Sequence, residues 1–385
     1  MASPATAPRQ APPAQQVRKR PFTWAAHQHT EYGGIDVLVS QAAGSVITVG
    51  DIPATGYLRN LCILLTTGTV GVAGTALADY PFNIFQELTL NDVNGAPIFG
   101  PLDGYSCYLA QLTGGYAFRQ DTKLQPNYSA STTAPAFMLR MPLEINENDG
   151  FGSISNMNSS QNYRVRIVLN PLASTFSVNP TTIPVLRLRV WIEAWTRPAD
   201  NSQSGAPQEV APPFHGVSQF WTKVTKPTVT GENYIAVPKV GNLIRALVFV
   251  FRDASGVRTD AQAGGAVGLL ELRLDQRVLQ QTPYDLLKTQ FAEGAVLSAA
   301  PDAGVAPFLF NDDELGHIGN GTQQLYLPTL QSSRLELRVP AALVGSVDIL
   351  TNDVARVAVD PNERYSFEGG TGFQANPDAS QFATR

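Results

Sequence analysis

Charged residues are scarce in this 385-residue sequence. Asp, Glu, Lys and Arg make up 15% of it, whereas about 25% is usual for a soluble globular protein. The net charge is −5 at pH 7, which argues against a protein that binds nucleic acid with its whole surface, since such proteins carry a basic domain or stripe. We expect a surface that is mostly uncharged and polar, or that is buried against partners.

Cysteine is equally scarce. Cys62 and Cys107 allow at most one disulfide, and we expect two free thiols in a protein that folds in a reducing cytoplasm. Residues 1–16 contain no apolar run of the kind that marks a signal peptide, so we expect no secretion by that route.

Long apolar segments are missing as well. One uncharged stretch, residues 60–78, contains four Thr and three Gly and is strongly apolar only over Leu61–Leu65. A transmembrane helix needs about 20 predominantly apolar residues. The stretch is therefore interpreted as a buried strand followed by a loop.

Histidine is too rare for a convincing metal site. The four histidines are His27, His29, His215 and His317. The first two could place two ligands on one face of a strand, but the pair lies at the edge of the N-terminal arm without further ligands of suitable spacing. The other two are isolated in the sequence. We expect no bound metal.

Phosphate-binding and hydrolytic motifs are missing too. Gly68, Gly71 and Gly74 follow an apolar strand, but Pro81 comes too soon for the helix that a phosphate loop requires. No P-loop, G-x-S-x-G or H-E-x-x-H motif occurs. We expect neither enzymatic activity nor a cofactor.

Two short acidic clusters remain as candidate sites. Glu144–Gly150 offers oxygen ligands but lacks the ligand order and the closing bidentate acid of a calcium loop, so we interpret it as a solvated turn. Asn311–Glu314 is similar, and paired carboxylates on a β-fold can also be glycosidase groups. This second cluster leaves open a two-jelly-roll carbohydrate-binding or carbohydrate-active protein as the alternative function.

Strand and turn residues are plentiful. The chain has 32 Gly and 28 Pro, and short apolar or alternating runs bounded by turn residues recur along it. In Val185–Trp195, for example, apolar residues alternate with charged ones over most of the run. This pattern is typical of an all-β sandwich or barrel.

The β-rich runs form two bodies separated by a stretch rich in Pro, Gly and Ser, which is the composition of an interdomain linker. We predict an N-terminal arm at 1–21, a first domain at 22–198, a linker at 199–213, a second domain at 214–359 and a C-terminal tail at 360–385.

The two bodies resemble each other in sequence. Four short matches occur in the same order, with offsets between 182 and 186 residues. The matches are Leu58–Leu65 with Ile244–Phe251, Glu87–Leu90 with Glu271–Leu274, Pro101–Asp103 with Pro283–Asp285, and Pro142 with Pro328. Self-similarity of this kind indicates one β-fold used twice.

The third match indicates a short helix inserted between strands in each body. Thr282–Asp285 has a Thr cap, a Pro at the first helical position and an acid in the first turn. Its counterpart, Pro101–Gln111, is predicted to be a weaker helix because Gly104 interrupts it.

The N-terminal arm is the one basic segment. Residues 1–21 hold five prolines and no acidic residue, and their basic groups are Arg9, Arg18, Lys19 and Arg20. Such a segment stays disordered until it meets a partner. Its charges can bind anionic lipid or the phosphates of a genome, but no aromatic residue lies between them, so we expect no sequence-specific nucleic-acid binding.

Together, these features resemble the double jelly-roll major capsid proteins of tailless, internal-membrane, double-stranded DNA bacteriophages of the tectivirus type and their relatives. The segment from Ala78 to Tyr105 is similar to stretches in phage capsid proteins of this kind. The resemblance implies an all-β fold of two tandem eight-stranded jelly rolls with a short inserted helix in each.

The resemblance also implies a function. Three copies would form a homotrimeric, pseudo-hexagonal capsomer that tiles an icosahedral virion shell and contacts neighbouring capsomers, vertex or penton proteins and minor capsid proteins. The arm would face the interior, where an internal membrane or the genome lies. The protein would be made and assembled in the host cytoplasm and would reside in the virion capsid.

Overall fold

The computed structural model describes most of the two predicted bodies. The described residues are 22–41, 46–49, 52–69, 71–72, 74–114, 121–146, 149–160, 162–198, 212, 219–238, 242–265, 268–295, 297, 301–311, 326–329 and 332–354. The N-terminal arm, the C-terminal tail and all of the predicted linker except Pro212 lie outside these ranges, so the predicted domain boundaries stay predictions.

Residues 28–195, here called the first roll, are built mainly from strands. Its principal strands are β1 (Gln28–Ser40), β2 (Val46–Val49), β3 (Gly56–Thr69), β5 (Phe85–Asn91), β6 (Pro97–Leu102), β7 (Phe137–Pro142), β9 (Arg164–Leu169) and β11 (Val185–Trp195). Shorter elements are β4 (Thr75–Ala76), β8 (Ile154–Asn156), β10 (Phe176–Val178), α2 (Gly104–Thr113), α3 (Leu172–Thr175), η1 (Phe82–Ile84) and η2 (Thr122–Leu124), and α1 (Phe22–Ala25) precedes β1.

Residues 219–354, here called the second roll, repeat the same plan. The principal strands are β12 (Gln219–Thr228), β13 (Gly231–Ala236), β14 (Leu243–Asp253), β15 (Leu269–Leu274), β16 (Arg277–Pro283), β17 (Val305–Leu309), β19 (Leu335–Ala341) and β20 (Gly345–Val354). Shorter elements are β18 (Leu327–Pro328), η4 (Asp260–Ala263) and α4 (Tyr284–Ala295). Among the described residues, no helix is long and apolar enough to cross a membrane.

The strand order is the same in both rolls. One sheet has its principal strands in the order first, eighth, third, sixth, which gives β1-β11-β3-β7 and β12-β20-β14-β17. The other has the order second, seventh, fourth, fifth, which gives β2-β9-β5-β6 and β13-β19-β15-β16. This is jelly-roll topology, so the predicted fold of two tandem jelly rolls, with a helix after the fifth principal strand of each, is confirmed.

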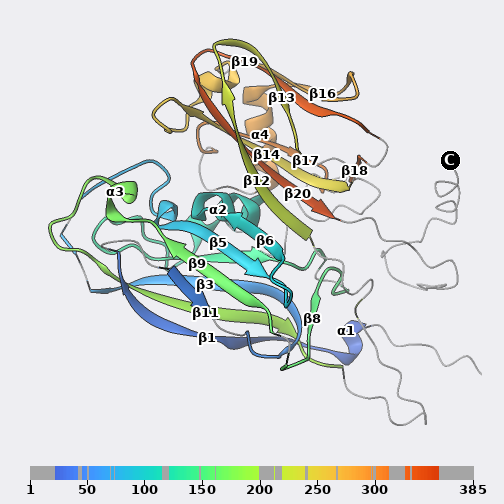
Figure 1. Cartoon of the computed structure of the whole chain (residues 1–385). Helices are drawn as coiled ribbons and strands as arrows, with labels where there is room; N and C mark the ends of the chain where they lie inside the picture. The colour runs from blue at the N-terminus through green and yellow to red at the C-terminus, as the bar shows by residue number, and fades with distance from the viewer. Residues whose placement is uncertain are drawn as a thin grey trace, which may run out of the picture.

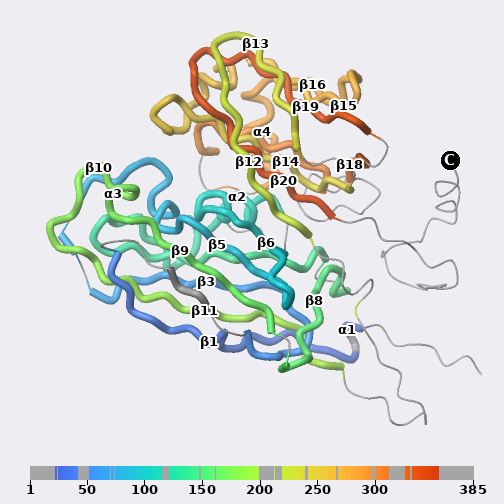
Figure 2. Tube along the Cα trace, in the orientation of Figure 1, coloured from blue at the N-terminus to red at the C-terminus, as the bar shows by residue number. Residues whose placement is uncertain are grey.

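The two rolls share a sheet. β6 of the first roll pairs in parallel with β12 of the second at Phe99 and Trp221, and the resulting sheet has nine strands. Figure 1 shows the first roll below and the second above, with α2 between them. Figure 2 follows the chain from blue to green through the first roll and from yellow to red through the second.

The hydrophobic core also crosses from one roll to the other. One cluster fills the first roll and includes all the buried apolar residues of α2 together with Val248, Val250 and Leu350 from strands of the second roll. A separate cluster, with Phe249 and Leu272 among its members, fills the interior of the second roll. β14 therefore buries both faces, since successive side chains point to opposite sides of a strand.

The sequence repeat extends to a buried arginine on a bulge. In the first roll the register between β3 and β11 shifts between Asn60 and Leu58, so that Arg59 lies on a bulge. In the second roll the pairing of β14 with β20 shifts in the same way at Arg245. The guanidinium carbons lie 5.1 Å from the ring centre of Trp195 and 5.4 Å from that of Tyr326. Both bulges sit within the first sequence match, which the structure thus confirms.

The fourth sequence match is wrong as a structural equivalence. Pro142 ends β7, the sixth principal strand, where it pairs with Asn60 of β3. Pro328 lies in β18, a short extra strand that pairs with Leu243 of β14. The strand equivalent to β7 is β17, and the segment that leads from β16 to β17 is shorter than the one that leads from β6 to β7, so a constant offset cannot hold here.

Candidate functional site at the junction of the two rolls

Helix α2 lies where the two rolls meet, and each of its residues from Gly104 to Thr113 is buried. Asp103 caps its first turn and accepts a hydrogen bond from the Ser106 amide at 2.8 Å. A Cβ atom on Gly104 would lie 2.1 Å from the Phe82 carbonyl oxygen, so only glycine fits there. The prediction that Gly104 interrupts this helix was wrong: Gly104 begins it.

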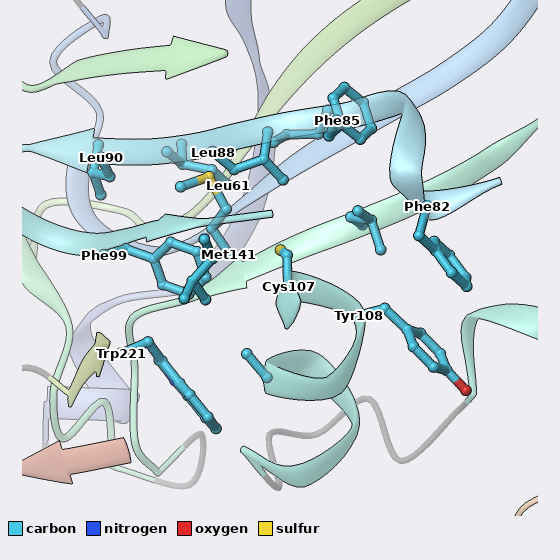
Figure 3. Close-up of a cluster of buried hydrophobic side chains, with 14 of the residues drawn as sticks. Leu61, Phe82, Phe85, Leu88, Leu90, Phe99, Cys107, Tyr108, Met141 and Trp221 are labelled. Atoms are coloured by element: carbon cyan, nitrogen blue, oxygen red, sulfur yellow. The ribbon is translucent and has the colours of Figure 1, made fainter. Parts of the chain in front are cut away.

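One side of α2 packs on the first roll. Figure 3 shows Cys107 and Tyr108 projecting from the helix toward Met141 and Phe82. The rings of Tyr108 and Phe82 stack with their centres 4.5 Å apart. Cys107 and Cys62 are both buried and form no disulfide, as predicted, and burial raises the pKa of both thiols.

The second roll binds the N-terminal end of α2 through Lys223. Its Nζ lies 2.5 Å from a carboxylate oxygen of the capping Asp103 and 3.1 Å from a carboxylate oxygen of Asp348 in β20. A carboxylate at a helix N-terminus is stabilised by the helix dipole. Lys223 therefore joins the start of this helix to the first sheet of the second roll.

The second roll also binds the C-terminal end of α2. Arg245 donates from Nη2 to the Gly114 carbonyl oxygen at 3.1 Å, and Asn311 donates from Nδ2 to the Thr113 carbonyl oxygen at 3.0 Å. The last carbonyl groups of a helix lack partners within the helix. Donors from the other roll satisfy two of them, so α2 is held at both ends by the second roll.

The partners of Arg245 are neutral although its side chain is fully buried. Arg245 donates to the Tyr326 hydroxyl at 3.1 Å, to Gln219 Oε1 at 2.8 Å and to Asn352 Oδ1 at 3.0 Å, in addition to Gly114. Its counterpart Arg59 instead pairs with the buried Glu144 at 2.8 Å. At Arg245 the negative end of the α2 dipole takes the place of that carboxylate.

A chain of ion pairs runs along the same junction. It contains four carboxylates and four cations in alternation, and four of its links connect one roll to the other. In order, the residues are Asp103, Lys223, Asp348, Arg252, Asp79, Arg258, Asp302 and Lys123. Each charge lies beside one of opposite sign, which is the arrangement that makes partly buried charges tolerable.

Tyr105 of α2 lies at the centre of this chain. Its hydroxyl donates to Asp302 at 3.0 Å, and its ring centre is 4.4 Å from the Arg258 guanidinium carbon and 5.9 Å from that of Arg252. Burial and the nearby Asp302 charge raise the pKa of Tyr105 far above its usual range. The hydroxyl therefore remains a donor, while the ring stacks with the cations of the second roll.

The carboxyl pKa values show which charges depend on the junction. Burial opposes ionisation of Asp103, but the Lys223 ammonium and the hydrogen bonds from Ser106 outweigh it and hold the pKa of Asp103 below its ordinary value. The pKa of Asp302 is lowered for the same reason, because Arg258 and Lys123 outweigh the effect of burial. Burial lowers the pKa of Lys223, but Asp103 and Asp348 raise it more, so the net shift is upward.

The structure describes only part of the two acidic clusters identified in the sequence. Glu144 was expected in a solvated turn, which is wrong: it is fully buried and accepts hydrogen bonds from Arg59 and Trp195. Asn311 is buried against α2, and residues 312–314 of the same cluster lie outside the described residues. The carbohydrate alternative gains no support from Asn311.

Of the four histidines, only His27 and His29 are described, and His215 and His317 lie outside the described residues. Arg9, Arg18, Lys19 and Arg20 lie outside the described residues. His29 lies 3.6 Å from Glu31 on β1, away from the junction. No group of three or more His, Cys, Asp or Glu side chains in the described ranges is placed to hold a metal ion.

Of the residues in the ion-pair chain, only Asp103 belongs to a motif that was identified in the sequence. One signal was available: Asp348 interrupts the apolar run of β20, and Arg252 follows directly after that of β14. A charge within or beside a run that is buried on both faces needs a partner of opposite sign.

The fold matches solved structures of viral capsid proteins. No protein-family model and no curated protein sequence matches the chain. The major capsid protein of Sulfolobus turreted icosahedral virus is 13% identical with a TM-score of 0.60, and the match covers 86% of this chain and 97% of that one. The major capsid protein of bacteriophage PM2 is 10% identical with a TM-score of 0.54, and the match covers 87% of this chain and 99% of that one. The PBCV-1 virus capsid model is 11% identical with a TM-score of 0.57, and the match covers 88% of this chain and 94% of that one. At these identities the similarity establishes the double jelly-roll fold.

We predict that Arg245→Met lowers the free energy of unfolding by about 3 kcal/mol, because it leaves the carbonyl of Gly114 and two side-chain acceptors buried without a donor. Denaturant titration measures the change. Arg197→Met is the matched control, since this side chain is exposed and its loss should change stability by less than about 0.5 kcal/mol. Equal effects of the two substitutions would contradict the role given to Arg245.

We predict that acid weakens the junction. A carboxyl whose pKa is lowered in the folded state stabilises the fold above its unfolded pKa, and this contribution is lost as pH falls through the folded value. For Asp103 and Asp302 the loss begins near pH 4.

Asp103→Asn tests this directly, because Asn still caps the helix but carries no charge for Lys223. We expect a flatter dependence of the unfolding free energy on pH below about 4 than in the parent, with a loss of about 1–3 kcal/mol at neutral pH. Parallel curves for parent and variant below pH 4 would refute the assignment.

Proposed function

We propose that the chain is a viral major capsid protein and that three copies form a pseudo-hexagonal capsomer of an icosahedral shell. The observation that carries this proposal is the repetition of one jelly roll in two copies that are fixed against each other by α2 and the ion-pair chain. A capsomer must present similar edges in defined directions, and a fixed junction provides that.

Symmetry gives the physical reason for three copies. Most soluble oligomers have closed point-group symmetry, and a threefold oligomer of chains with two similar rolls places six similar bodies around one axis. The lateral edges of such a ring are nearly equivalent, so that it can pack in a near-hexagonal lattice. Large, permanent contacts between subunits are depleted in charged residues, which agrees with the 15% charge content.

The similarity to capsid proteins supports a location in the virion shell and a structural role without an active site. We place the N-terminal arm on the inner side, where Arg9, Arg18, Lys19 and Arg20 would contact an internal membrane or the genome. A tailless phage with an internal membrane is the source we favour, with vertex and minor capsid proteins as further partners and assembly in the host cytoplasm.

We predict that the purified protein has three times the mass of the 41.4 kDa chain, measured by sedimentation equilibrium or mass photometry. Because the subunits of a capsomer are held by large, permanent contacts, the trimer should persist on dilution. A monomer that is stable at every concentration would refute the capsomer proposal.

We predict that deletion of residues 1–20 leaves the trimer intact, because this Pro-rich, basic segment has few apolar residues to contribute to a core, but impairs particle assembly or binding to anionic vesicles. The charge dependence is checked by a full-length variant with the four basic residues of the arm replaced by Gln. Normal assembly and normal vesicle binding by both variants would remove the proposed role of the arm.

A further inference from the structure

Among the sheet edges in the part of the chain that the structure describes, two belong to strands whose equivalents in the other roll pair with each other. β1 is the outermost strand of its sheet in the first roll, and β16 is the outermost strand of its sheet in the second. Figure 1 shows both on outer sides of the molecule, away from α2. An open edge presents unpaired backbone N–H and C=O groups, to which another strand can add.

The repeat indicates what occupies these edges. β6 and β16 are the fifth principal strands of their rolls, and β12 and β1 are the first. Within the chain, β6 lies beside β12 in parallel. The same kind of contact is therefore already made once, between the fifth strand of the first roll and the first strand of the second.

We propose that β16 of one copy lies beside β1 of the next copy, in parallel, and repeats between chains the contact that β6 and β12 make within a chain. The inference rests on the proposed capsomer and names the surfaces that close it. Because the two surfaces differ, the contact is head-to-tail, and such contacts form a ring when the rotation closes.

The pairing pattern fixes the register on β1. Within the chain the contact joins Phe99 to Trp221. In the second roll, Asn352 pairs with Trp221 on one side and with Ala246 on the other. The sequence repeat matches Ala246 to Asn60, and in the first roll Glu193 pairs with Asn60 on one side and with Thr30 on the other. Thr30 is therefore the counterpart of Trp221.

The register on β16 follows from the same reasoning. Phe99 pairs with Leu90, and the matched Leu274 pairs with Arg277. Arg277 is therefore the counterpart of Phe99 and meets Thr30 of the next copy. Both side chains are exposed within one chain.

A second contact follows from the helices. In the second roll, the outer face of the first sheet, with Val248, Val250 and Leu350, is buried in the cluster that contains α2. The equivalent positions in the first roll are Cys62, Leu64 and Trp191, by the matched strand pairings.

This equivalent face is partly uncovered within one chain, although Cys62 itself is buried. Leu64 and Trp191 are partly exposed, and Tyr32, whose ring lies 5.8 Å from that of Trp191, is 45% exposed. The helix equivalent to α2 is α4, which exposes Asp285, Leu286, Thr289, Gln290 and Glu293. We place this exposed side of α4 over the uncovered face of the next copy.

The charges at the two surfaces are complementary. Asp285, in the first turn of α4, corresponds to Asp103 at the start of α2. The counterpart of Asp348 in the first roll is Arg189, by the matched pairings of β11 and β20. The Nε atom of Arg189 is buried with no hydrogen-bond partner among the described residues. The Asp285 carboxylate of one copy would therefore face the Arg189 guanidinium of the next, whose Nε–H is available as a hydrogen-bond donor.

A disulfide between copies tests the strand contact. In the full-length protein with Thr30→Cys and Arg277→Cys, mild oxidation should give covalent dimers and trimers on a non-reducing gel, with no larger species. The native Cys62 and Cys107 are buried, which keeps the background low. The control pairs Thr30→Cys with Glu232→Cys, an exposed position on β13 at the opposite edge of the same sheet, and should not cross-link.

Charge exchange tests the helix contact independently. Arg189→Glu and Asp285→Arg should each weaken trimer association by about tenfold or more, and the double variant should restore it. A trimer without the 30–277 cross-link, or with equal cross-linking in the control, overturns this inference and leaves the capsomer proposal standing. A parent protein that is a stable monomer overturns the capsomer proposal itself.

Discussion

The fixing of α2 at both ends by the second roll is the interaction on which the rest of the structure depends. Asp103 at its start is bound by Lys223, and Gly114 at its end is bound by Arg245. The helix belongs to the core of the first roll and covers a sheet of the second. A change in the angle between the rolls would therefore break the helix caps and expose apolar surface in both bodies. The two rolls form one mechanical unit.

Much of the fold was predictable from local sequence. Val185–Trp195 alternates and forms β11 over the same residues, and the match of Leu58–Leu65 with Ile244–Phe251 identified the duplicated strand. β1 and β17 were not predicted as strands. β1 contains Gly33 and Gly34, where its register with β11 shifts, so alternation is broken. β17 contains Pro307, which an edge strand tolerates because its outer N–H groups are not needed.

The candidate site was less predictable because its residues come together only in three dimensions. Lys123 and Asp302 form an ion pair at 2.8 Å although 179 residues separate them in sequence. Glu144 belongs to a polar segment that favours a turn, but its carboxylate is needed by the buried Arg59. The low charge content was interpreted as a property of the surface. In the structure, eight charged residues lie in the ion-pair chain between the rolls. The few charged residues of this chain are therefore partly concentrated at the junction and not spread evenly over the surface.

Alternation of sign along that chain has a consequence for the response to ionic strength. Four carboxylates and four cations balance one another, so the junction has almost no net field at distances beyond the Debye length, about 8 Å at physiological salt. Partly buried pairs are also screened much less than exposed ones. Added salt should therefore leave the geometry inside one copy unchanged and act on the exposed charges at its outer edges. Ionic strength then changes the association between copies without changing the arrangement of the two rolls within a copy.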